Sequence, residues 1–124
     1  MESSLKITEQ PLDSSNGYQI IRFTGTFDKN GYNQIDGALE TILRQFMDLD
    51  PDATKNLVFD FTDLDYINSQ GIGILMEVHN KLAGTGKALV IVGLKQNVAD
   101  VFQAIGMNEL ISIYPSIQSF LEGK

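Results

Sequence analysis

The chain has 124 residues, of which 43% are hydrophobic and 20% are charged, values typical of one soluble globular domain. It contains no cysteine and one histidine, which excludes a disulfide framework, a thiolate nucleophile and a metal site with several histidine ligands. Sixteen acidic residues against nine basic ones give a net charge of −7, which argues against binding to a nucleic-acid backbone.

Two strands are expected first. Residues 5–8 alternate between apolar and polar, and residues 18–23 are rich in β-branched and aromatic side chains. The polar turn at 13–17 between them predicts an antiparallel hairpin. Apolar residues then recur at spacings of three and four, which predicts an amphipathic helix over residues 31–48, followed by a surface loop at 48–54.

The remaining elements alternate between strands and helices. The sequence predicts a buried strand at 57–61, a connecting loop at 62–68 and a helix at 69–83. The continuous apolar run at 88–92 is typical of a strand in a parallel sheet that helices cover. A short helix at 97–106, a strand at 111–114 and a helix that Pro115 can open, through Leu121, complete the chain.

This order of elements predicts the fold class. The series β-β-α-β-α-β-α-β-α indicates a single α/β domain over residues 1–124, with a mixed β-sheet, an N-terminal hairpin and about four helices packed against the sheet. The first residues lack the charged and apolar regions of a signal peptide, and no apolar run approaches the ~20 residues that span a bilayer. We therefore expect a cytoplasmic protein with no membrane partner and no nucleic-acid partner.

Function is expected in the segment 57–76, where a buried strand leads into a turn and then a helix. The turn ends in Asn68-Ser69-Gln70-Gly71, directly at the helix start. Backbone N–H groups at a helix start lack intrahelical partners, and the helix dipole is positive there. Ser69 therefore has two interpretations. It is an N-cap that stabilises the helix by about 1 kcal/mol, or a phosphorylation site whose phosphate those N–H groups hold.

The stretch from Asp60 to Gly73 resembles the signature of the STAS domain, the fold of bacterial anti-sigma factor antagonists. That signature is a strand ending in an aspartate, a short loop, and then Asp-Ser-Ser/Thr-Gly-Leu-Gly at the start of a helix. Asn68 stands here in the place of the second aspartate, and Gln70 in the place of the second hydroxyl residue. The resemblance covers nearly the whole chain, through residues 24–28, 86–93 and 97–107.

The resemblance implies a protein-binding switch and not an enzyme, with no catalytic residue, no cofactor and no metal. Members of the family bind an anti-sigma factor serine kinase of the histidine-kinase-like ATPase fold. Phosphorylation of the helix-start serine, here Ser69, releases that kinase, and a metal-dependent serine phosphatase reverses the modification. We expect a monomer in isolation. The expected partner-binding residues are Asp28, Asp60, Asn68, Ser69, Gln70, Gly71 and Glu77.

Two alternatives stay open at this point. In the first, Ser69 is only a cap, and the chain is a non-switching STAS adaptor subunit of a transport or regulatory complex. In the second, the chain is a nucleotide-binding module, because helix starts that bind phosphate can also bind nucleotides. Neither a P-loop nor a complete dinucleotide fingerprint is present in the sequence to support the second alternative.

Overall fold

The computed structural model describes residues 4–10, 17–49 and 55–123, and five of its strands form one sheet in the order β1-β2-β3-β4-β5. β1 is antiparallel to β2, and the other neighbouring strands are parallel. The predicted mixed α/β sheet with an N-terminal hairpin is thus confirmed, while turn residues 13–16 lie outside the described residues. The strands are β1 (Leu5–Glu9), β2 (Tyr18–Phe27), β3 (Asn56–Ile67), β4 (Ala88–Val92) and β5 (Ser112–Tyr114).

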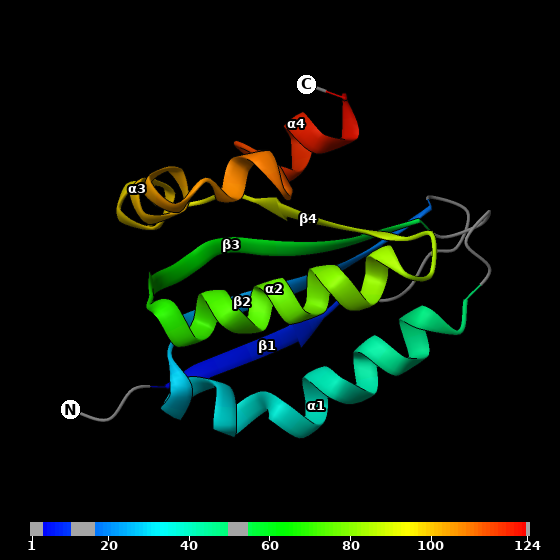
Figure 1. The fold of residues 1–124 in the computed structure, drawn as a ribbon, viewed down its shortest axis with the longest axis horizontal. Helices are drawn as coiled ribbons and strands as arrows, with labels where there is room; N and C mark the ends of the chain where they lie inside the picture. The colour runs from blue at the N-terminus through cyan, green and yellow to red at the C-terminus, as the bar shows by residue number, and fades with distance from the viewer. Residues whose placement is uncertain (1–3, 11–16, 50–54, 124) are drawn as a thin grey trace.

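Four α-helices pack against this sheet, as expected. They are α1 (Lys29–Met47), α2 (Ser69–Ala83), α3 (Gln96–Ile105) and α4 (Ile117–Leu121), with a 3₁₀ turn, η2 (Met107–Glu109), after α3. Figure 1 shows α1 and α2 on one side of the sheet and α4 on the other, beyond β4. None of the helices in the described ranges has the length and apolar character that crossing a membrane requires.

Side chains of β3 alternate between the two faces of the sheet, as the pleat of a strand dictates. Leu57 and Phe59 join the main core with residues of α1 and α2. Val58, between them, joins a smaller cluster with Val90 of β4 and Phe120 of α4 on the opposite face. Helices on both faces therefore explain why 88–92 is a continuous apolar run, and why 57–61 is apolar except for Asp60, instead of alternating between apolar and polar residues.

The prediction of a loop at 62–68 is wrong, because β3 continues to Ile67. The pairing of β3 with β2 shifts register twice, between Arg22 and Thr24 and between Gly25 and Thr26, and each shift adds one residue to β3. The buried apolar residues of this part, at 61, 64 and 67, are consequently spaced by three. A spacing of three hides a strand from a search for strict alternation.

A buried lysine joins the start of β4 to the end of α1. Lys87 is 4% exposed, and its Nζ donates to the carbonyl oxygens of Phe46 and Leu49, each at 2.5 Å. The same Nζ lies 4.6 Å from the centroid of the Phe46 ring. The C-terminal end of a helix carries partial negative charge, so this ammonium group stabilises the last turn of α1, through Phe46, and the turn that follows it, through Leu49.

Lys87→Met should therefore destabilise the fold by about 2–3 kcal/mol, because charge-assisted hydrogen bonds to helix-end carbonyls are lost and the apolar stem is kept. Urea unfolding followed by circular dichroism measures this change. Lys55→Met, at an exposed lysine just before β3, is the matched control and should change the free energy of unfolding by less than about 0.5 kcal/mol. Equal stabilities of the two variants would contradict the assignment.

Candidate functional site at the starts of α1 and α2

The starts of α1 and α2 lie at the same end of the sheet (Figure 1). Phe27 and Ile67 are paired at the last position of the β2–β3 ladder, and the chain leaves each strand directly into a helix. The positive ends of two helix dipoles therefore lie at one place, which is the carboxyl end of the parallel strands. Ligands of open α/β sheets bind at this end.

An acidic or amide side chain caps each of the two helices. Asp28 caps α1, and its Oδ1 accepts from the N–H of Gly31 at 2.8 Å. Asn68 caps α2, and its Oδ1 accepts from the N–H groups of Gln70 and Gly71, each at 3.1 Å. The two caps are adjacent, because the N–H of Asn68 donates to the carbonyl of Phe27, the residue before Asp28.

Ser69 is not the N-cap, and that interpretation of the sequence is wrong. Asn68 has the extended backbone of a cap, with φ −113° and ψ −175°, and its carbonyl accepts the first helical hydrogen bond from Ile72. Ser69 is instead the first residue of α2 and is exposed. Its hydroxyl makes no hydrogen bond within the part of the chain that the structure describes. This serine is therefore available for chemistry without loss of a cap.

A depression of about 270 Å³ lies beside the two caps. Sequence reasoning missed Lys29 and Asn30 in its lining, because the first helix was predicted to begin at residue 31. The signal was present in Asp28, whose residue type is typical of an N-cap and places the helix start at 29. The depression is lined by Asp28, Lys29, Asn30, Asn68 and Gln70.

Two glycines of α2 have opposite surroundings. A Cβ atom on Gly71 would lie 2.3 Å from the carbonyl oxygen of Phe27, so only glycine allows α2 to rest on the end of β2. A Cβ atom on Gly73 would have no neighbour within 4 Å. Gly71 is buried, which places this predicted partner-binding residue beneath the surface that Ser69 and Gln70 form.

Alanine substitutions at these glycines should therefore change stability in opposite directions. Gly71→Ala should destabilise the fold by about 2 kcal/mol or more, through overpacking against a backbone atom. Gly73→Ala should stabilise it by about 0.5–1 kcal/mol, the difference between the two residues inside a helix. Thermal unfolding of both variants checks this, and a Gly71→Ala protein as stable as the wild type would contradict the packing described.

Glu77 lies two turns along α2 from Ser69 and is exposed. It contributes to a negative potential between α2 and α1, where burial first, and then a hydrogen bond and charge from Asp36, raise the pKa of Tyr32 to about 12. The charges of Glu77 and Glu40 act in the same direction. This side of the site therefore carries the negative charges of Asp36, Glu40 and Glu77.

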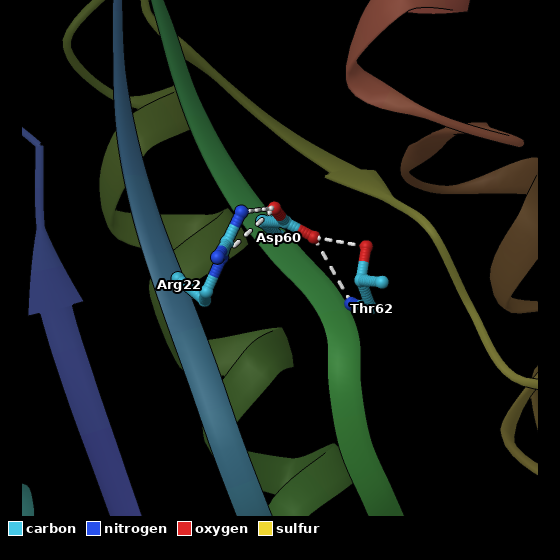
Figure 2. Close-up of polar contacts among 3 residues, drawn as sticks. All are labelled: Arg22, Asp60 and Thr62. Carbon is cyan, nitrogen blue, oxygen red and sulfur yellow. Dashed lines mark hydrogen bonds and ion pairs between the residues drawn. The ribbon is translucent and has the colours of Figure 1, made fainter.

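Asp60 does not join the surface around Ser69. It is 2% exposed and lies on β3, seven residues before Ile67 and the end of the strand. Figure 2 shows its carboxylate between Arg22 and Thr62. Oδ1 accepts from the N–H of Thr62 at 3.0 Å and from its hydroxyl at 2.6 Å, and Oδ2 lies 3.4 Å from Nη2 of Arg22. The carboxylate therefore stabilises β3 at the first shift in its register with β2, which falls between the paired residues Asp60 and Asp63.

Asp60→Ala should destabilise the fold by about 2–3 kcal/mol, because a charged acceptor is lost from the backbone N–H of Thr62. Arg22→Ala should cost only about 1 kcal/mol, since the arginine is half exposed, its pair is long and Asp60 keeps both bonds from Thr62. Chemical denaturation of the two variants gives the order. A larger loss for Arg22→Ala would show that the ion pair, and not the bonds to Thr62, holds this part of β3.

Comparison with known proteins now identifies the family. The family model of the STAS domain matches residues 10–120. The chain belongs to the STAS family. A search of curated proteins gives no significant match. Within the described ranges of this STAS domain, no three His, Cys, Asp or Glu side chains are placed to hold a metal ion.

Solved structures share the fold of this STAS domain. An anti-sigma factor antagonist from Mycobacterium paratuberculosis is 19% identical, with a TM-score of 0.72 over 97% of this chain and 93% of that one. Unphosphorylated SpoIIAA, an anti-sigma factor antagonist, is 17% identical, with a TM-score of 0.68 over 96% and 98%. The murine Slc26a9 anion transporter is 14% identical, with a TM-score of 0.69 over 98% of this chain and 22% of the transporter. Identities this low show the fold alone.

Proposed function

We propose that this STAS domain is a non-enzymatic partner-switching regulator of the anti-sigma factor antagonist type. In this proposal it binds an anti-sigma factor serine kinase of the histidine-kinase-like ATPase fold, and phosphorylation of Ser69 switches that binding off. A metal-dependent serine phosphatase restores the binding form. Family membership and the fold shared with anti-sigma factor antagonists support the regulator class.

The observation that carries the proposal is that two different residues supply the cap and the free hydroxyl at the start of α2. Asn68 supplies the capping oxygen, so the hydroxyl of Ser69 is exposed and does not serve the fold. A serine that only capped the helix would lose a stabilising bond when it was modified. Ser69 loses none, and it therefore can gain and lose a phosphate while the domain stays folded.

A phosphate on Ser69 adds about −1.5 to −2 charges and strong acceptor oxygens at the positive end of α2. The N–H groups of Gln70 and Gly71 are already bonded to Asn68. A phosphate on Ser69 would therefore find two of the helix-start donors already bonded to Asn68, while Lys29, which lines the adjoining depression, adds a positive charge to this end of the molecule. The chemical character of the surface changes at this end of the molecule.

The proposed contact surface follows from this geometry. The exposed side chains of Ser69 and Gln70 form its centre, the two caps Asp28 and Asn68 form one side, and Glu77 extends it along α2. Gly71 supports this surface from beneath. Its negative charges favour a partner with basic residues, and a phosphate placed among those charges opposes such a contact through misfit and loss of solvation.

The decisive test compares Ser69→Asp with the wild-type chain as baits in a lysate of the source cells. Mass spectrometry identifies the captured proteins, and calorimetry with the purified kinase measures affinity. The larger, strongly solvated aspartate should weaken kinase binding by about tenfold or more, through misfit and loss of solvation at the contact, whereas Ser69→Ala should bind as the wild type does. The purified kinase should transfer phosphate from ATP to the wild type and not to Ser69→Ala.

Asn80→Asp is the matched control, because it adds one negative charge to an exposed position three turns further along the same helix. It should retain the kinase. Capture of the same proteins, at equal affinity, by wild type and Ser69→Asp would refute the switch. That result would favour the adaptor function, for which the fold shared with a segment of an anion transporter is the supporting observation.

A further inference from the structure

Gly73 is an exposed glycine inside α2, where glycine weakens a helix relative to alanine. The backbone does not require it, since its residue is helical and is absent from those with positive φ. The packing does not require it either, because a Cβ atom there would meet nothing within 4 Å. Neither the backbone conformation nor the packing of the described residues therefore accounts for this glycine.

The position of Gly73 relative to Ser69 supplies that reason. Residues four apart lie on the same face of a helix, and Ser69 and Gly73 are both exposed. Side chains on a helix lean toward its N-terminus, so a residue covers the surface over the turn that precedes it. A side chain at position 73 would therefore extend over the hydroxyl of Ser69.

We propose that Gly73 keeps the approach to the Ser69 hydroxyl open for the active site of the kinase that phosphorylates it. This inference rests on the proposed function, and it names a residue that determines access to the Ser69 hydroxyl, the oxygen that would receive the phosphoryl group. Transfer of a phosphoryl group requires the donor to come within roughly 3–3.5 Å of the acceptor oxygen in the correct direction. The part of the kinase that delivers the phosphoryl group would then approach the first turns of α2, where Gly73 presents no side chain.

A second open glycine gives a matched control. Gly37, inside α1, is also exposed and would also have no neighbour of its Cβ within 4 Å. Gly73→Gln and Gly37→Gln add the same uncharged side chain to a helical position, and both should raise helix stability. Only the first of them extends over Ser69.

The first experiment measures access without any partner. The chain contains no cysteine, so Ser69→Cys introduces a single thiol. Rates of labelling with N-ethylmaleimide and with the bulkier pyrene maleimide are compared, and their ratio cancels the intrinsic reactivity of the thiol. Gly73→Gln should lower the rate with the bulky reagent relative to the small one by about fivefold or more, because the added side chain covers the preceding turn. Gly37→Gln should leave the ratio unchanged, and an unchanged ratio in Gly73→Gln would overturn the inference.

The second experiment uses the kinase that the wild-type chain captures. Gly73→Gln should lower kcat/KM for phosphorylation of Ser69 by about tenfold or more, since a blocked approach prevents productive alignment. Gly37→Gln should be phosphorylated at the wild-type rate. Wild-type kinetics for Gly73→Gln would overturn the inference. If no kinase is captured, the proposed function fails, and the ratio of labelling rates still decides whether Gly73 keeps Ser69 open.

Discussion

The arrangement of the site depends on one packing constraint, the contact of two helix starts with the last residues of β2. A Cβ atom on Gly31 of α1 would lie 2.2 Å from the carbonyl oxygen of Thr26. One on Gly71 of α2 would lie 2.3 Å from the carbonyl oxygen of Phe27. Because both positions are glycine, both helices approach the same strand end, and their dipoles converge beside a single depression. A side chain at either glycine would force the backbone at that helix start or at the end of β2 to shift.

Within this frame, two neighbouring residues have different roles. Asn68 makes the hydrogen bonds that begin α2, and Ser69 presents a hydroxyl to solvent. The resemblance to the family leads one to expect an aspartate at position 68, and asparagine caps a helix as well as aspartate does. The substitution therefore preserves the start of the helix and removes one negative charge beside the proposed phosphate. The departure from the signature alters electrostatics and leaves geometry intact.

The sequence was sufficient to predict the order and type of the elements, because hydrophobic periodicity and glycine positions are local signals. It also placed the start of α2 at Ser69. It failed for residues 62–67, where two bulges change the spacing of Phe61, Leu64 and Ile67 from two to three. Bulges arise from pairing with β2, which is a tertiary property that local patterns do not contain.

The candidate site was predicted only in part, because some of its features follow from local signals and others depend on tertiary structure. Asp28, Asn68 and Gln70 line one depression because they follow neighbouring parallel strands, which the order of elements already indicated, and Ser69 stands between Asn68 and Gln70 in the chain. Asp60 was expected at this surface from the family signature alone. It is instead buried beside Arg22 and Thr62, because of the face of the sheet to which its position in β3 directs its side chain. The assignment of the cap to Asn68 instead of Ser69 required backbone angles, which adjacent capping residues do not reveal.

Contacts at both ends of α1 bear on how the proposed phosphorylation of Ser69 would affect the rest of the domain. Lys87 fixes the last turn of the helix to β4, and the seat of Gly31 on β2 fixes the first. Contacts at both ends of a helix oppose its sliding along the sheet. Under the proposed function, the modified and unmodified molecules would then share one scaffold, and a partner would distinguish them by the chemistry of a few side chains at one end. A switch of this kind would work without a rearrangement of the fold.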